Sequence, residues 1–235
     1  NHTIEKNVSV ADGWTNYQAV KPGDTVCISA GSRQKLTLKN FTGSPDNPIT
    51  FINAGGQVLF NKASDFALNF QNSRFFHLSG SGENNSTYGF KVDGNYTSGL
   101  RLREKSSNFE IDHLEITHTT GPGILAKSNA TCSNAADVYY DYDNDGLTTG
   151  DRDDVVNRST FTQFNSIFHH NFIHHIGTEG FYIGSSFHQG KSLNCAGLSE
   201  TSQEPLLIGV QVYENIVTHT GWDGIQVGSA SQNCN

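Results

Sequence analysis

The sequence predicts an all-β protein that folds as a single-stranded right-handed parallel β-helix, a solenoid in which short strands of successive coils stack. One observation is a repeated motif in which polar corner residues and Gly precede a short strand with apolar residues at alternate positions. Its clearest copies are residues 173–185 and 217–229, a third is 117–128, and a fainter fourth is 88–94. Such repeats are typical of solenoids. The second observation is composition: 24 Gly, no Met and a hydrophobic fraction of only 35% suit short strands with Gly-marked turns.

The first 60 residues are expected to form an N-terminal cap and the first coils. Turn signals rich in Pro, Gly and Asn separate short β-branched or aromatic runs, and no helical periodicity is present. We expect strands at 25–29, 36–38, 49–52 and 57–60.

Residues 61–235 are expected to form the remaining coils of one domain. Two longer stretches, 129–159 and 186–205, interrupt the repeat, and both leave it after the same strand. Insertions at one corner of a solenoid lie on one face, so we expect these two excursions to lie together. The chain stops at Asn235 just after a complete repeat, which suggests an array that continues beyond it.

Alignment of the repeats predicts which side chains point inward. One inward column is expected to hold Phe90, Ile124, Phe181 and Ile225, and a second Val92, Ala126, Ile183 and Val227. The residues between them are expected to face outward, because successive side chains of a strand alternate. These are Lys91, Leu125, Tyr182 and Gln226.

Three segments near the start carry a family resemblance: 22–26, 47–51 and 55–58. They resemble the opening coils of secreted, pectin-lyase-like β-helix proteins, most closely the group of chondroitinase-B-like and alginate lyases and uncharacterised bacterial β-helix repeat proteins. The resemblance covers residues 20–60 and implies a secreted protein of this fold that acts on polysaccharides. Lyases of this group use a Lys base and an Arg, with Ca²⁺ neutralising the uronate. No local motif ties a Lys or Arg of this chain to those positions.

Charge and hydropathy exclude some functions. The net charge of −8 argues against binding of nucleic acid through its phosphates. No stretch approaches the ~20 apolar residues of a membrane span. The resemblance implies a polysaccharide or another glycan as the partner, and further domains of a larger surface protein are other candidates.

The four cysteines indicate an oxidising compartment. None forms a Cys-x-x-Cys pair, so a zinc site of that type is not expected. Cys195 and Cys234 each follow the same repeat position, which favours a Cys195–Cys234 disulfide. Cys132–Cys195 is the competing pair, and free buried thiols are the third alternative. A disulfide would place the protein outside the cell or at its surface.

An acidic stretch in the first excursion suggests a calcium site. Residues 141–147 read Asp-Tyr-Asp-Asn-Asp-Gly-Leu, with oxygen ligands at alternate positions and a Gly for the turn. It resembles the calcium loops of EF-hand and thrombospondin-type proteins, except that Arg152 stands at the twelfth position. The expected ligands are Asp141, Asp143, Asp145 and Asp151, in a structural role. A solvated acidic loop is the alternative.

The repeat also stacks titratable residues. Glu179 aligns with Asp223, and His175 aligns with His219. Paired carboxylates cleave glycosidic bonds in hydrolases, and His can act as a general base. These four residues are the candidate catalytic set. The competing interpretation is a row of turn acids and corner imidazoles with a structural role.

Candidate substrate-binding residues lie beside this set. Tyr182 and Trp222 offer rings for sugar stacking, Gln226 a polar partner and Lys127 a cation for an acidic sugar. The sequence thus predicts a secreted carbohydrate-active module that binds, and in one version cleaves, a polysaccharide by lyase or hydrolase chemistry. The alternative is a non-catalytic adhesive or structural surface module stabilised by calcium, because the fold hosts both.

Overall fold

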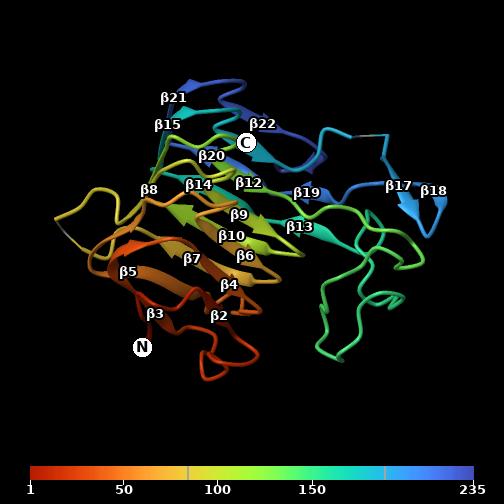
Figure 1. The fold of residues 1–235 in the computed structure, drawn as a ribbon, viewed down its shortest axis with the longest axis horizontal. Helices are drawn as coiled ribbons and strands as arrows, with labels where there is room; N and C mark the ends of the chain where they lie inside the picture. The colour runs from red at the N-terminus through yellow and green to blue at the C-terminus, as the bar shows by residue number, and fades with distance from the viewer. Residues whose placement is uncertain (84, 188) are drawn as a thin grey trace.

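The fold is a parallel β-helix, as predicted. The computed structural model describes residues 1–83, 85–187 and 189–235, and these contain 23 strands and no helix. Figure 1 shows the coils stacked from the N-terminal to the C-terminal end, with the two excursions projecting on one side. No helix long and apolar enough to cross a bilayer occurs in the described part of the chain.

Three faces surround the core. The first face comprises β7, β10, β14 and β20 with the first half of β5, and the second face comprises β8, β11, β15 and β21 with the second half of β5. Both belong to one eleven-stranded sheet, because β5 pairs with β7 through Ile49–Ile52 and with β8 through Val58–Phe60. Its strands are β1 His2–Ile4, β3 Thr25–Arg33, β5 Ile49–Phe60, β7 Arg74–Ser79, β8 Phe90–Asp93, β10 Ser107–Asp112, β11 Leu114–Thr117, β14 Ser166–His169, β15 Phe172–Ile176, β20 Gln211–Tyr213 and β21 Ile216–Thr220.

The third face is the seven-stranded sheet. It consists of β2 Val10–Asp12, β4 Leu36–Lys39, β6 Leu68–Gln71, β9 Leu100–Arg103, β12 Ile124–Ala126, β16 Phe181–Ile183 and β22 Ile225–Val227. A smaller parallel sheet holds β13 Thr162–Phe164, β19 Leu206–Ile208 and β23 Ala230–Gln232. An antiparallel hairpin, β17 Lys191–Cys195 with β18 Leu198–Ser202, belongs to the second excursion.

Apolar side chains of the three faces fill the interior. A row of phenylalanines runs along the axis, with neighbouring ring centroids 4.2–5.7 Å apart; it contains Phe41, Phe51, Phe70, Phe76, Phe109, Phe168 and Phe181. Each of these rings is buried. A fully buried aromatic or aliphatic side chain contributes about 1.5–3 kcal/mol, so this row is a large part of the folding free energy.

One predicted column was assigned to the wrong face. Ile124, Phe181 and Ile225 do stack on the third face, but the residue below them is Leu100, not Phe90. Phe90 lies on the second face between Val58 and Leu114. The second column shifts in the same way: Leu102, and not Val92, lies below Ala126. Likewise the outward neighbour of Leu125 is Arg101, and Lys91 instead pairs with Leu59 and Glu115.

The two excursions leave the third face after β12 and β16, as predicted, and a disulfide joins them. The bond links Cys132 to Cys195 across 63 residues, while Cys234 is free. The favoured Cys195–Cys234 pairing is therefore wrong, and the competing pair is correct. Cys234 follows β23, which continues the coil, whereas Cys132 and Cys195 both belong to excursions that project at the same corner.

The first excursion lies along the coil stack and covers successive corners. The Tyr140 hydroxyl donates to Asn40 Oδ1 at 2.8 Å, and the Tyr142 hydroxyl donates to Glu104 Oε2 at 2.6 Å. Asn72, from the coil between them, donates to the Tyr142 carbonyl at 3.4 Å. These three corner residues have positive φ angles of 62°, 45° and 51°. The first excursion is therefore held against the coils by corner side chains, which the positive φ angles direct outward.

Candidate functional site

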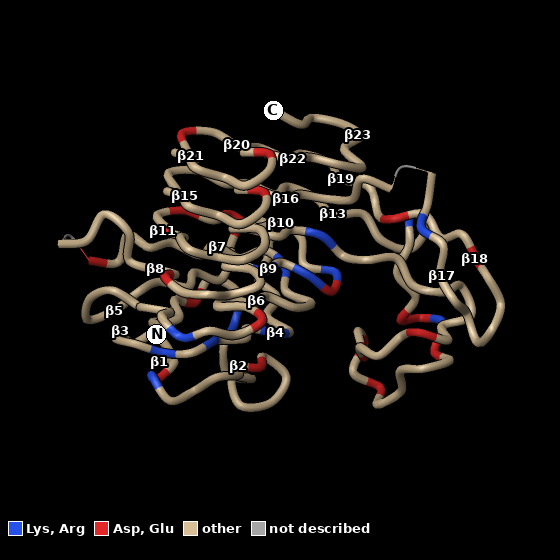
Figure 2. The backbone as a smooth tube through the Cα atoms, turned by 45° about the horizontal axis from the view of Figure 1, so that its top comes forward, with Lys and Arg blue, Asp and Glu red and all other residues tan. Residues whose placement is uncertain are grey.

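The outward side of the third face carries a cluster of cations. Strand register places Arg101 beside Leu125 and Leu125 beside Tyr182, which in turn pairs with Gln226. Lys127 hydrogen-bonds through its backbone to Leu102 and so lies level with Arg103. Figure 2 shows the Lys and Arg positions gathered next to β9, on the side where the excursions project. Arg101, Arg103 and Lys127 thus form a local basic surface on a chain of net negative charge. Within it Arg101 pairs with Asp65 at 3.7 Å and Arg103 with Glu104 at 3.6 Å.

Lys127 and Tyr182 form the centre of this surface. The Lys127 ammonium lies 4.7 Å from the centroid of the Tyr182 ring, and the Tyr182 hydroxyl lies 3.2 Å from Ser186 Oγ. A cation held over an aromatic ring is worth about 0.5–1 kcal/mol at a partly exposed site. The pair keeps the cation on the outward side of the sheet.

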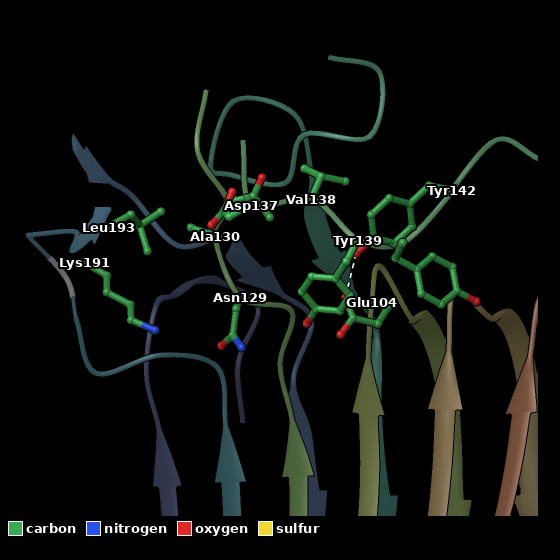
Figure 3. Close-up of a pocket in the computed structure, with 11 residues that line it drawn as sticks. Glu104, Asn129, Ala130, Asp137, Val138, Tyr139, Tyr142, Lys191 and Leu193 are labelled. Atoms are coloured by element: carbon green, nitrogen blue, oxygen red, sulfur yellow. Dashed lines mark hydrogen bonds between the residues drawn. The ribbon is translucent and has the colours of Figure 1, made fainter. Parts of the chain in front are cut away.

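A pocket of about 150 Å³ adjoins this surface beyond the carboxyl ends of the strands. Figure 3 shows Lys191 and Asn129 at one end of the pocket and Tyr139 and Tyr142 at the other, above the strand ends. Its lining residues come from the corner after β9, the first excursion and β17: Glu104, Asn129, Ala130, Thr131, Asp137, Val138, Tyr139, Tyr140, Tyr142, Lys191 and Leu193. Lys127 and Lys191 form no ion pair within the described ranges.

The pocket floor is a buried polar network. Glu104, only 8% exposed, accepts from the Tyr142 hydroxyl and lies 3.6 Å from Arg103. Burial and the Glu104 charge raise the pKa of Tyr142 far above its ordinary value. The Lys105 ammonium lies 4.2 Å from the centroid of the Tyr142 ring, and burial lowers its pKa. Tyr142 is therefore a neutral hydroxyl donor at all physiological pH values.

The predicted catalytic residues lie at and after the corner between the second and third faces. Glu179 and Asp223 occupy one column, since Gly180 hydrogen-bonds to the Asp223 carbonyl at 3.0 Å. Glu179 is 5% exposed, whereas Asp223 is exposed. The His175 and His219 rings stack as predicted, with centroids 4.7 Å apart. No hydrogen bond or ion pair joins these carboxylates to these imidazoles in the described part of the chain, and their catalytic role stays a prediction.

The remaining predicted binding residue, Trp222, lies at that same corner. Its backbone donates to the Thr178 carbonyl at 3.0 Å, and the residue is 68% exposed. Gln226 lies further along the coil, beside Tyr182. Three of the four predicted binding residues therefore lie on the third face: Tyr182, Gln226 and Lys127. The fourth, Trp222, lies at the corner that precedes this face.

Among the described residues, two groups of side chains have ligand atoms close enough to hold a metal ion, within 4.8 Å of one another. They are Asp141, Asp143 and Asp145, and His77, Glu110 and Asp112. The predicted ligand Asp151 is outside the first group, and its Oδ1 instead accepts from the Asp153 backbone at 3.0 Å.

The carboxyls in and near the acidic loop differ in the direction of their pKa shifts. Desolvation opposes ionisation of Asp141, but backbone hydrogen bonds from Gly146 and Asn144 outweigh it and lower its pKa. Partial desolvation and the charges of Asp145 and Asp151 raise the pKa of Asp143. Nearby Asp154 is fully buried; its Oδ1 accepts from the Tyr142 backbone, and its Oδ2 has no partner among the described residues. Burial and the Asp151 and Asp143 charges raise the pKa of Asp154. A bound cation would relieve this repulsion.

Sequence reasoning did not place the arginines. Arg101 and Arg103 were not grouped with Lys127, because the predicted column placed Phe90, and not Leu100, below Ile124. The alternation Leu100-Arg101-Leu102-Arg103 is itself a strand with apolar residues inward and cations outward. That pattern could have placed the two arginines on the face that Lys127 occupies.

The fold and this surface define a parallel β-helix protein with a basic, tyrosine-containing face beside a pocket. No protein-family model, curated protein or solved structure matches the chain. The resemblance to chondroitinase-B-like and alginate lyases therefore rests on the motifs of residues 20–60 alone.

Proposed function

We propose that this protein binds an acidic polysaccharide along the third face, with one sugar unit in the adjoining pocket. The observation that carries the proposal is Lys127, whose ammonium lies over the Tyr182 ring and makes no ion pair within the described ranges. Its backbone lies level with Arg103. Aromatic rings bind the apolar faces of sugars, and cations bind uronate carboxylates. The two excursions form a wall on one side of this surface.

The pocket supplies polar groups of the kind that orient a sugar. Asn129 and Tyr139 offer an amide and a hydroxyl, and Lys191 offers a second cation at the far end. Its volume of about 150 Å³ suits one monosaccharide unit. The remainder of the chain would lie across the strands of the open sheet.

Calcium belongs to the same proposal in a structural role. Asp141, Asp143 and Asp145 would bind Ca²⁺ and order the first excursion, which forms one wall of the pocket. The Cys132–Cys195 disulfide fits an oxidising compartment, and we propose that the protein is secreted or displayed at a cell surface.

Binding assays with alginate, polygalacturonate, chondroitin sulfate and neutral dextran test the function. We expect the acidic polymers to bind and dextran not to bind. Lys127→Ala and Tyr182→Ala should each weaken binding by about 10-fold, the loss of roughly 1.4 kcal/mol. Lys62→Ala, an exposed lysine elsewhere, should have no effect. Equal binding by all variants, or binding of dextran alone, would contradict the proposal.

The same assays distinguish an enzyme from a binding module. Unsaturated uronate products, detected by ultraviolet absorbance, indicate a lyase, and reducing ends without absorbance indicate a hydrolase. A hydrolase should lose turnover but not binding on Glu179→Gln or Asp223→Asn. Binding without any product identifies a non-catalytic adhesive module.

A further inference from the structure

A second group of chemically active side chains lies on the first face, away from the basic surface. His77 in β7, Glu110 and Asp112 in β10, and His169 in β14 come from three adjacent strands. The strand register places Glu110 beside His77 and Asp112 beside His169. Residues on different strands of this group are 33 to 92 positions apart in the sequence, and only the stacking of coils brings them together.

Both carboxylates lie against imidazole nitrogens. His77 Nε2 contacts Asp112 Oδ2 directly. His169 Nε2 lies 2.7 Å from Glu110 Oε1 and 4.0 Å from Asp112 Oδ2. Ligand atoms in a tetrahedral site with metal–ligand bonds near 2.1 Å lie ~3.4 Å apart. The ligand atoms of His77, Glu110 and Asp112 all lie within 4.8 Å of one another, so these three side chains can reach one metal ion. His169 is outside this group and adjoins it through its contact with Glu110.

Asp112 is positioned by groups behind it. Its residue is 2% exposed. Its Oδ1 accepts from Ser79 Oγ at 2.7 Å and also contacts His113 Nδ1. Oδ1 is thus occupied by hydrogen-bond donors, and Oδ2 is the atom that points to His77. Carboxylates that bind metals are commonly held by such outer hydrogen bonds.

His169 is held in a similar way. Its Nδ1 lies 2.7 Å from His170 Nδ1, and His170 Nε2 lies 3.2 Å from Glu214 Oε2. Its ring stacks on Tyr213 with centroids 5.0 Å apart. If the His170 Nε2–H donates to Glu214, His170 Nδ1 accepts from the His169 Nδ1–H. In that tautomer His169 Nε2 has its lone pair available as a metal ligand.

We propose that His77, Glu110, Asp112 and His169 bind a divalent transition metal ion of the Zn²⁺ type. The two carboxylates balance the charge of a dication. The two neutral imidazoles favour transition metals such as Zn²⁺ over Ca²⁺. The site is accessible, because a groove of about 250 Å³ reaches His77 and Glu110 along the first face. Glu110, with a side chain 40% exposed, lies on the open side, and Asp112 lies on the closed side.

Zinc titration of the metal-stripped full-length chain tests the proposal. Isothermal titration calorimetry should give one Zn²⁺ per chain. His77→Ala and His169→Ala should each weaken binding by more than about 100-fold, and His170→Ala by about 10-fold through loss of ring orientation. The double variant His175→Ala/His219→Ala removes two exposed stacked histidines on another corner and should bind as the wild type does. Asp141→Asn/Asp143→Asn should also keep Zn²⁺ affinity.

The visible absorption of bound Co²⁺ tests the site in the wild-type protein, so this readout does not require any variant to fold. Co²⁺ bound to two imidazoles and two carboxylates in a four-coordinate site should give intense visible bands, which Zn²⁺ displaces. A weak spectrum like that of aqueous Co²⁺ would overturn the proposal. So would Zn²⁺ binding that survives both His77→Ala and His169→Ala, or that is lost in the His175→Ala/His219→Ala control.

Discussion

The Tyr142 hydroxyl donates a 2.6 Å hydrogen bond to Glu104 Oε2 and so connects the first excursion to a corner of the coil stack. The contact lies at the floor of the pocket, where Glu104 is almost fully buried. The wall of the pocket is therefore attached to the β-helix through a charge-assisted hydrogen bond. This attachment gives the first prediction.

Tyr142→Phe should destabilise the excursion. Removal of the hydroxyl leaves a buried carboxylate oxygen without its donor, which costs about 1–3 kcal/mol. Limited proteolysis should therefore cut within 129–159 faster than in the wild type, and urea unfolding should shift to lower midpoint. Tyr139→Phe is the matched control, because Tyr139 is 71% exposed. Equal protease resistance of the two variants would show that the contact carries no stability.

Reduction of the disulfide should destabilise the protein. The loop that Cys132 and Cys195 close is 63 residues long. The chain-entropy model gives roughly 4 kcal/mol for a loop of this size. Cys132→Ser should lower Tm and make it insensitive to reductant, while Cys234→Ser should leave Tm unchanged. A large effect of Cys234→Ser would instead support the pairing first expected from sequence.

Calcium should stabilise the first excursion. At a free Ca²⁺ concentration 100 times Kd, binding to the folded state alone adds about 2.7 kcal/mol. Chelation should therefore lower Tm and expose 129–159 to protease. Asp141→Asn/Asp143→Asn should remove the response, and Asp46→Asn, an exposed acid elsewhere, should retain it. An unchanged melting curve on chelation would disprove the calcium site.

The free-energy cost of placing an acidic side chain in an inward column should depend on which coil carries it. Ile183 is fully buried, whereas Val227 in the same column is 41% exposed because β22 is the edge strand. Ile183→Asp should cost more than about 4 kcal/mol, the range of a buried unpaired charge. Val227→Asp should cost less, and Gln226→Asp on the outward side the least. Chemical denaturation of the three variants gives this order directly, and equal costs would contradict the column assignment.

Low pH should remove the contribution of the Asp12 carboxylate to the free energy of unfolding. Burial opposes ionisation, but hydrogen bonds from Asn40 and the Trp14 backbone, with Lys39 3.2 Å away, outweigh it and hold the pKa below the ordinary 3.8. A lowered folded-state pKa gives stability that is complete above the unfolded value and is lost as pH falls through the folded value. The stability difference between wild type and Asp12→Asn should be constant at neutral pH and shrink below about pH 4. A difference that persists in acid would mean that the charge of Asp12 contributes nothing.

The site was only partly predictable, for a reason that individual residues illustrate. Tyr182 and Gln226 were paired correctly, because their two coils share the full motif, which fixes register. Phe90 was assigned to the wrong face, because the alternation of apolar and polar residues in Phe90-Lys91-Val92 fits a strand on any face of the solenoid. Only the pairing of β8 with β5 and β11 assigns it to the second face.

The sequence by itself determined the architecture: an all-β solenoid, its inward apolar columns in the later coils and two excursions from one corner. These follow from local alternation and from a repeat whose spacing forces stacking. The tertiary structure decided which side chains meet across coils, including Cys132 with Cys195, His77 with Asp112, and Glu110 with His169. Coil lengths vary, so sequence spacing does not fix these pairs, and only the hydrogen-bonded register of neighbouring strands does.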